Sequence, residues 1–559
     1  MQPYSAVLAV GLAMAVATAC GGKISDDGDG RGGTGMASPA TMTGGRGGTA
    51  AVAAAAGVLP MRLLTRAEYD NTVLDLLGDD SHPAAAFPPE DAGSTGFAQV
   101  QKLDDVNIGA YLKAAETIAE RASKDLKTLM GCDPAGAAEL VCVKSFVTSF
   151  GRRAYRRPLR DAEVDEHVAL YTDTLKGTLK LGINEAMPTL VAAMLQSPFF
   201  LYRWESAWEA SRDGRELKLN AHHLASQLSY FFWSSMPDAE LMAAADRGEL
   251  QTTAQIQAQA VRLLADPRAE RSISSFVEQW LGITALEGAL RSKPGWGPTL
   301  ARAMIAETDR FAADVILKGN GLLTTLFTSR LSSADATLAA FYGNKTITGT
   351  TPQPLTFAQG ERAGILTLAA TLAAHADEND ASPILRGKLI RERVMCDAIP
   401  PPPGGVPDLP APDPNTPKKQ RFAMHAQGTC KGCHELMDPI GFAFEHYDNV
   451  GAYRTMDGKL PVDSSGAIKG LDGSDQSFTS AVDMMDLLGN SDQVRTCLMK
   501  QFFRFGFARK ENEDADVASL KAASDAFRSS NGNIRKMLAA LATSRVMTHR
   551  SLAAGEVLP

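Results

Sequence analysis

Apolar residues recur at the spacing of an amphipathic helix in several parts of the chain. From Tyr69 onward they fall three or four positions apart, so they share one helix face. Thr65 and Glu68 stand at the spacing of a capping box, and Gly78 follows the last apolar residue. Together these signals predict a helix within residues 63–78.

The same period is found in four other segments, while strand-like alternation is scarce. The helical segments are 219–233, which Asn220 would cap, 272–283, 362–376 and 533–544. Turn residues within 454–468 predict one small β-hairpin. The sequence therefore predicts a mainly α, multi-domain protein.

Composition agrees with an ordinary globular chain. Of the 559 residues, 45% are hydrophobic and 21% are charged, and the net charge is −8. At roughly 150 residues per domain, this length predicts about three or four folding units. No long basic run is present in the sequence, so we expect no nucleic-acid partner.

Breakers and shifts of composition divide the chain. The proline-rich run 398–417 is expected to follow an extended path over the surface. The predicted divisions are a signal peptide at 1–20, a disordered Gly-, Ser- and Thr-rich tether at 21–58, an N-terminal helical domain at 59–130, a basic helical domain at 131–180, a central helical domain at 181–320, a segment with a cysteine motif at 321–470, and a C-terminal helical domain at 471–559.

The N-terminus indicates export. Residues 6–19 are apolar and uncharged, which is typical of a signal peptide and too short to span a membrane stably. Small residues lead up to Cys20, and this ending resembles a bacterial lipobox, in which the cysteine becomes the lipidated N-terminus. A plain signal peptide cut near Ala19 is the alternative. We expect a periplasmic or cell-surface protein, anchored as an outer-membrane lipoprotein.

The string CKGCH carries the most specific chemistry in the sequence. It comprises Cys430, Cys433 and His434, and C-x-x-C-H is the attachment pattern of c-type haem. Two cysteines three apart on a helical turn can each form a thioether to a haem vinyl group, and the next histidine can bind the iron as its proximal ligand. The motif therefore predicts one covalently bound haem c.

Three other interpretations of CKGCH compete with haem. A zinc site would need further ligands at comparable spacing, and the sequence contains no second CxxC and no HxxxH. A thioredoxin-like dithiol needs a βαβ context, which the helical surroundings lack. The third is a chance match or a structural disulfide between the two cysteines.

The remaining cysteines suggest disulfides. They are Cys132, Cys142, Cys396 and Cys497, and an oxidising compartment favours their pairing. Four cysteines allow three connectivities. The short loop between Cys132 and Cys142 makes that pair the natural first choice, and Cys396 would then pair with Cys497. Buried free cysteines are the alternative.

The sequence around CKGCH resembles a known family. Residues 430–455 are similar to the cytochrome-type domain of a large family of planctomycete and myxobacterial surface proteins. Further blocks that resemble this family follow one another along nearly all of the exported chain: 62–78, 152–159, 228–241 with 276–282, 382–403 and 497–509. The resemblance implies haem and export, and it makes 321–470 a cytochrome c-like domain. Because these domains are mostly of unknown function, it names no substrate.

Candidate iron ligands lie close to the motif. The second ring nitrogen of His434 is expected to donate to the carboxylate of Asp438 or to the carbonyl of Pro439. His425, which recurs in the family block, and Met456 are candidates for the sixth ligand. His446 and Met437 are further options, although Met437 lies one turn from His434 and so on the proximal side.

Charged residues after the motif allow more than one role. Arg454 could pair with a haem propionate or form a plain salt bridge. Glu445 and Asp448 stand at a spacing that suits acid–base chemistry, but we expect them on a solvated helix face. The basic stretch 152–157 could dock an acidic partner or be structural.

We therefore expect an exported monohaem cytochrome c-like protein that passes electrons to a redox partner protein. One alternative is a haem-dependent oxidative enzyme that acts on an extracellular substrate. The other is a non-redox surface lipoprotein that binds a partner. His222 and His223 lie in a predicted core helix, where packing is expected rather than a second haem or metal site.

Overall fold

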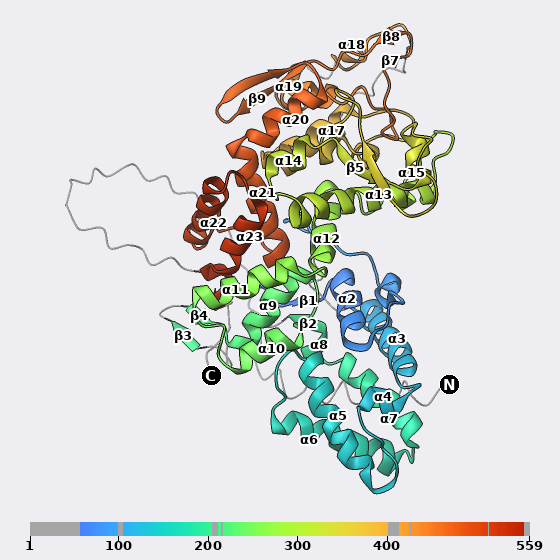
Figure 1. Cartoon of the computed structure of the whole chain (residues 1–559), viewed down its shortest axis with the longest axis vertical. Helices are drawn as coiled ribbons and strands as arrows, with labels where there is room; N and C mark the ends of the chain where they lie inside the picture. Colours follow the sequence, from blue (N-terminus) through green and yellow to red (C-terminus); the bar gives the residue numbers. More distant parts are fainter. Residues whose placement is uncertain are drawn as a thin grey trace, which may run out of the picture.

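The structure is a computed structural model that describes residues 56–98, 104–203, 211–213, 216–400, 413–423, 427–512 and 514–552. The predicted signal peptide with Cys20, nearly all of the predicted tether, His425 and most of the proline-rich run lie outside the described residues. The described chain is mainly α-helical, as predicted (Figure 1).

The structure confirms the helix caps that the sequence predicted. Helix α2 (Arg66–Leu77) begins after Thr65, whose side chain accepts from the backbone N–H of Glu68 in a complete capping box. It ends at Gly78, which has a φ of 72°. Helix α9 (Ala221–Trp233) begins after its cap Asn220. The predicted helices at 272–283 and 533–544 are α12 (Ala269–Leu281) and α23 (Ile534–Ala542).

The predicted helix at 362–376 is wrong in its extent. The structure has a 3₁₀ turn, η7 (Ile365–Thr367), followed by the short helix α16 (Ala369–Ala374). Gly364 has a φ of 67°, and a Cβ on it would overlap the carbonyl of Phe327. Leu368 is extended, with a φ of −67° and a ψ of 149°. Close packing against the preceding segment therefore breaks a continuous apolar pattern.

The strands form small antiparallel sheets. The predicted hairpin is present as β7 (Met456–Asp457) and β8 (Leu460–Pro461), and a longer pair directly follows it. The other sheets were not predicted from the sequence. The pairs are β1 (Arg62–Leu63) with β2 (Tyr202–Arg203), β5 (Leu331–Ala334) with β6 (Gln353–Thr356), β9 (Gly466–Leu471) with β10 (Ser474–Phe478), and the three-stranded order β11 (His549–Ser551), β4 (Glu216–Lys218), β3 (Ser211–Asp213).

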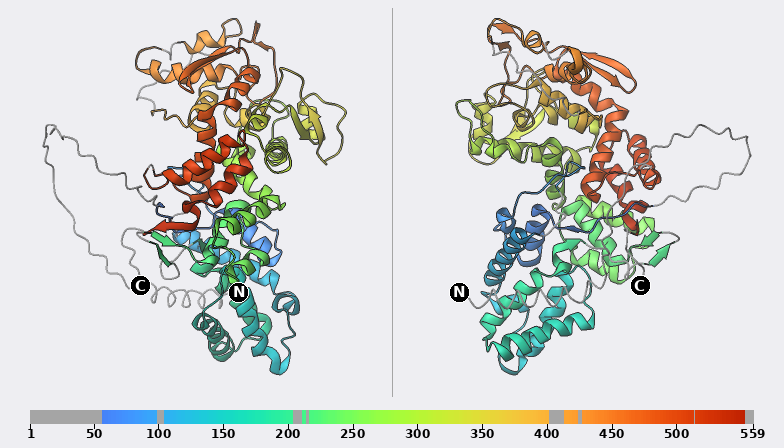
Figure 2. Two further views of the ribbon diagram at one scale, coloured as in Figure 1. Left: turned by 60° about the vertical axis from the view of Figure 1, so that its left-hand side comes forward. Right: turned by 180° about the vertical axis from the view of Figure 1, so that it is seen from behind.

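One hydrophobic core fills the N-terminal part of the molecule, and α9 contributes Tyr230 to it. Helices α5 and α6 lie at this end of the elongated molecule (Figures 1 and 2). The elements around this core, besides α2, are η1 (Pro83–Ala86), α3 (Asp105–Ala122), α4 (Leu126–Met130), η2 (Gly136–Ala138), α5 (Glu139–Ala154), α6 (Asp161–Ala169), the π-helix η3 (Leu170–Thr178), α7 (Ile183–Leu195) and α8 (Pro198–Leu201).

A second core takes residues from elements between α9 and α24, so it crosses the predicted domain boundaries at 321 and 471. Helices α19 and α20 and strand β9 lie at the end of the molecule opposite α5 and α6 (Figures 1 and 2). The remaining elements are α10 (Ala239–Asp246), α11 (Thr253–Ala265), η5 (Leu286–Gly288), α13 (Pro298–Ala313), η6 (Asp314–Lys318), α14 (Leu323–Thr328), α15 (Ala336–Phe341), α17 (Pro383–Leu389), η8 (Ile390–Val394), α18 (Lys418–Phe422), η9 (Gly428–Cys430), α19 (Lys431–Phe442), α20 (Ala481–Asn490), α21 (Asp492–Phe507), α22 (Val517–Ser529) and α24 (Arg545–Thr548).

Within the described residues, none of the helices combines the length and the apolar character that crossing a membrane would require.

Candidate functional site

The CKGCH motif forms the start of α19. Cys430 closes the 3₁₀ turn η9 and is the residue before the helix, while Cys433 and His434 lie in its first turns. Residues i, i+3 and i+4 share one helix face, so the two cysteines and the histidine are presented on the same side of α19. Cys430 and Cys433 are free thiols and partly exposed. This arrangement suits attachment of one planar group at two points beside an imidazole.

His434 is held by a carboxylate one turn further along α19. Its Nδ1 lies 3.0 Å from both carboxylate oxygens of Asp438. An ionised carboxylate can only accept, so the proton of a neutral imidazole sits on Nδ1. Nε2 is then the unprotonated ring nitrogen, which is the kind of atom a metal ligand must offer. Of the two partners that the sequence allowed, the structure selects Asp438.

Close backbone contacts fix α19 against α17. A Cβ on Gly441 would overlap the carbonyl of Pro383, and a Cβ on Gly387 would overlap the carbonyl of Met437. Buried Arg391 adds hydrogen bonds from Nε to the carbonyl of Leu436 (3.0 Å) and from Nη1 to the carbonyl of Lys469 (2.8 Å). The helix that carries the motif is therefore held against α17 and η8.

The expectation that Glu445 and Asp448 lie on a solvated helix face is wrong. Both follow the end of α19, and Glu445 is only 3% exposed. Its carboxylate pairs with Lys418 (3.2 Å) and with Arg454 (3.0 Å), which also pairs with Asp457 (2.6 Å). These partners come from segments on either side of α19, and only the tertiary fold brings them together. Arg454 thus forms the structural salt bridge that the sequence left open.

Asp448 organises a turn. Its Oδ1 accepts from the backbone N–H groups of Val450 (3.0 Å) and Ala452 (2.9 Å), and its Oδ2 pairs with Lys293 (2.5 Å). The turn itself is bound from inside by Arg386, which is 1% exposed.

Arg386 was missed by the sequence analysis. Its guanidinium donates to the carbonyls of Leu372, Phe444, Tyr447 and Asp448 at distances of 2.6–3.1 Å. Burial lowers the pKa of Arg386 to about 10. The available signal was an arginine inside the apolar run of α17, which requires buried acceptors.

Candidates for the sixth ligand are spread over different environments. Met456 lies on β7 and is 47% exposed. His446 donates a hydrogen bond from Nδ1 to the carbonyl of Arg454 (2.8 Å), because a carbonyl oxygen can only accept, and its ring stacks on Tyr453. Met437 is buried within α19. His425 lies outside the described residues.

Five family models match the chain in succession, and each is described as a protein of unknown function. They are DUF1587 at residues 62–124, DUF1595 at 142–205, DUF1592 at 219–343, DUF1588 at 362–457 and DUF1585 at 474–546. These are the domains that accompany the planctomycete cytochrome c-type domain. The DUF1588 match contains CKGCH, Asp438, Glu445 and Arg454. The searches of curated proteins and of solved structures found no match.

Both predicted disulfides are present. Cys132 pairs with Cys142, and Cys396 pairs with Cys497. Cys396 follows η8 and precedes CKGCH in the chain, while Cys497 lies on α21.

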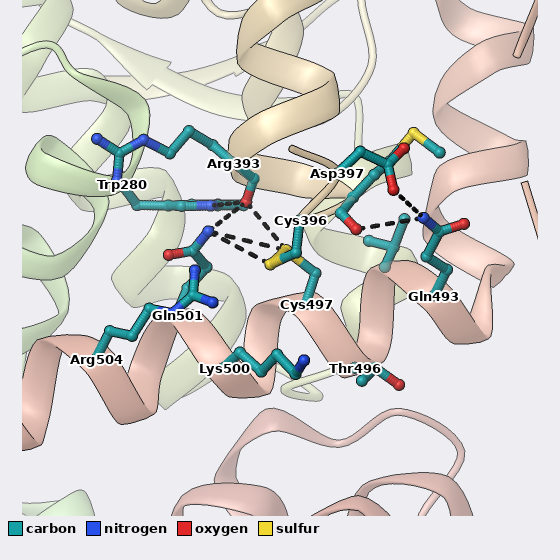
Figure 3. Close-up of a disulfide and its surroundings, with 12 residues drawn as sticks. Trp280, Arg393, Cys396, Asp397, Gln493, Thr496, Cys497, Lys500, Gln501 and Arg504 are labelled. Carbon is teal, nitrogen blue, oxygen red and sulfur yellow. Dashed lines mark hydrogen bonds between the residues drawn. A yellow bond between two sulfur atoms is a disulfide. The ribbon is translucent and has the colours of Figure 1, made fainter. Parts of the chain in front are cut away.

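The surroundings of the second disulfide fix both of its sides (Figure 3). The carbonyl of Arg393 accepts from Trp280 Nε1 (2.8 Å) and from Gln501 Nε2 (3.0 Å). Asp397 accepts from Gln493 (2.9 Å) and from Arg391 (3.0 Å). The segment that leads to CKGCH is therefore tied to the C-terminal helices by a covalent bond and by hydrogen bonds.

The remaining candidate clusters have structural roles. Within the basic stretch 152–157, buried Arg156 donates to backbone carbonyls that include Phe199 and Tyr202, and buried Arg157 pairs with Glu163. Burial alone would raise the pKa of Glu163, but hydrogen bonds from Arg157 and Arg160 lower it to about 2.

His222 pairs with Asp246 at 3.0 Å, whereas His223 is buried. Among the described residues, no group of three or more His, Cys, Asp or Glu side chains is arranged to hold a metal ion.

Proposed function

We propose that this chain binds one haem c covalently through Cys430 and Cys433, with His434 as the proximal iron ligand, and that it transfers electrons at the bacterial cell envelope. The observation that carries the proposal is the shared face of α19. It presents two free thiols beside an imidazole whose Nδ1 is already engaged by Asp438. Bound haem supplies a one-electron couple between ferric and ferrous iron.

The use of the other cysteines supports this assignment. Four of the seven cysteines form the two disulfides. The Cys396–Cys497 disulfide joins residues on either side of the motif, and the Cys132–Cys142 disulfide lies far before it in the sequence. The two thiols of CKGCH are therefore left for another chemistry. The family models also support the binding of haem, because the domains that they describe accompany a cytochrome c-type domain.

The proposed location of the protein is the bacterial cell envelope. The leader and Cys20 would place the chain outside the cytoplasm, held by a lipid anchor in the outer membrane, and attachment of haem c follows export. A protein that accepts or donates electrons is the partner this role requires. His434 would hold the iron, and the thioethers would keep the group in place without a deep pocket.

Expression of the full exported chain in a host with the cytochrome c maturation machinery tests the proposal. We expect a pyridine haemochrome spectrum of haem c and an added mass of one haem. The double variant Cys430→Ser/Cys433→Ser should lose both signals. The matched control Cys132→Ser/Cys142→Ser removes two other cysteines and should keep them.

The spectra also separate the alternatives. A colourless mature chain with no added mass would contradict the proposal and leave a non-redox binding protein. A reduced form that binds CO rapidly through an open iron position would contradict the carrier role and favour an oxidative enzyme.

A further inference from the structure

The hydrogen bond between His434 and Asp438 lies in a sheltered position. The side chains of the two residues are 11% and 8% exposed, and both carboxylate oxygens lie 3.0 Å from Nδ1. A hydrogen bond to an ionised acceptor is stronger than one to a neutral carbonyl, and partial exclusion of water strengthens it further. The contact is therefore strong enough to fix the ring tautomer.

The backbone around Asp438 has little freedom to move. The carbonyl of Met437 is in close contact with Gly387, and Gly441 is in close contact with the carbonyl of Pro383. The carbonyl of Leu436 accepts from Arg391. These contacts bracket Asp438 on α19, so the carboxylate is held in place before any ligand is bound.

We infer that Asp438 is a positioning residue that orients His434 toward the iron and lowers the reduction potential of the haem. This inference rests on the proposed function. A carboxylate that accepts the Nδ1 proton makes the imidazole a more basic ligand than a backbone carbonyl does. A more basic ligand favours ferric over ferrous iron, and hydrogen bonding around the iron ligands is one of the means by which a protein sets haem potential.

The neighbouring Glu435 provides a matched control on the same helix. It is adjacent to His434 in sequence, so it carries the same charge close to the motif. Its side chain is 40% exposed and pairs with Lys431 (3.4 Å) and Lys469 (3.2 Å). Solvent and these lysines screen its charge. The geometry therefore separates the effect of a hydrogen bond from the effect of a nearby charge.

The test compares the haem-loaded wild-type chain with Asp438→Asn and Glu435→Gln by redox titration. Asparagine keeps the shape and an acceptor oxygen but removes the charge. We expect Asp438→Asn to shift the ferric-to-ferrous equilibrium at least tenfold toward ferrous iron, which is about 59 mV for a one-electron couple. Glu435→Gln should shift it less than threefold. Equal shifts in the two variants, or none in Asp438→Asn, would overturn the inference.

A second measurement does not depend on haem. In the full chain with ¹⁵N-labelled histidine, His434, identified by its loss in His434→Gln, should show a protonated Nδ1. This tautomer preference should be lost in Asp438→Ala. If Nδ1 of His434 is not protonated in the wild-type chain, the inference is overturned even if haem is bound. If the wild-type chain binds no haem, the proposed function fails, while the tautomer still decides whether Asp438 orients His434.

Discussion

Glu307 shows how burial changes a single ionisable side chain. It lies in α13, is 1% exposed, and accepts hydrogen bonds from Tyr342 (2.6 Å) and Ser332 (2.7 Å). Burial raises its pKa to about 7, although these hydrogen bonds and the charges of Arg362 and Arg310 act in the opposite direction. The residue links α13 to β5 and to the segment after α15. Because its pKa differs between the folded and the unfolded chain, its protonation affects the free energy of unfolding.

This raised pKa predicts a pH dependence of stability. Below pH 4.5 the carboxyl is protonated in both the folded and the unfolded chain, so it has no effect. Between pH 4.5 and 7 the unfolded chain ionises first, so the free energy of unfolding falls as pH rises, and above pH 7 the loss stays constant. The full difference is about 3 kcal/mol.

Glu307→Gln should remove this decline. Relative to wild type, the variant is expected to gain up to about 3 kcal/mol between pH 4 and pH 7.5, measured by urea unfolding at both values. Glu120→Gln, at an exposed position of α3, should leave the relative stability unchanged. If the difference in the free energy of unfolding between Glu307→Gln and wild type stays constant with pH, the raised pKa of Glu307 is contradicted.

At the scale of elements, the contact of α17 with α19 depends on glycine. Gly387 and Gly441 let the two backbones approach until carbonyl groups occupy the space of a side chain. This contact decides the position of the CKGCH motif, because the motif opens the same helix. The sequence pattern predicted neither the contact nor the partner helix, since a glycine within a helix does not reveal which carbonyl lies against it.

Gly441→Ala should therefore destabilise the chain by about 2–3 kcal/mol, since the backbone of α17 has to shift to make room. Gly432→Ala is the matched change at the other end of α19, where no described atom lies within 4 Å of the added Cβ. It should be neutral or stabilise by about 0.5–1 kcal/mol, because alanine is the better helix former. Denaturant midpoints measure both, and similar losses in both variants would contradict the packing argument.

At the scale of the whole molecule, the Cys396–Cys497 disulfide spans 101 residues and encloses the entire CKGCH block. The Cys132–Cys142 disulfide spans 10 residues in the N-terminal part. The larger core continues across both ends of the longer loop. The covalent bond thus joins the start of the motif-bearing segment to α21 within one packed body.

Removal of the two disulfides should have unequal effects. In the chain-entropy model, closing a loop of this larger size is worth about 4–5 kcal/mol, and the small loop roughly 2–3 kcal/mol. Cys396→Ala/Cys497→Ala is therefore expected to lower the free energy of unfolding more than Cys132→Ala/Cys142→Ala does. Unfolding under non-reducing conditions measures both, and the reverse order would contradict this account.

The sequence by itself determined the features that depend on local interactions. The boundaries of α2 follow from the Thr65 capping box and from Gly78, because caps act within one helical turn. The spacing of CKGCH placed its side chains on one face of a helix before any tertiary contact was known. Helical periodicity likewise predicted the mainly α class.

Only the tertiary structure decided the features that need partners distant in sequence. It buried Glu445 between Lys418 and Arg454 where a solvated face was expected. It broke the predicted helix at Gly364 because Phe327 packs against that backbone. Periodicity records which residues are apolar, whereas the burial of a charge or a glycine depends on which atoms another segment brings to it.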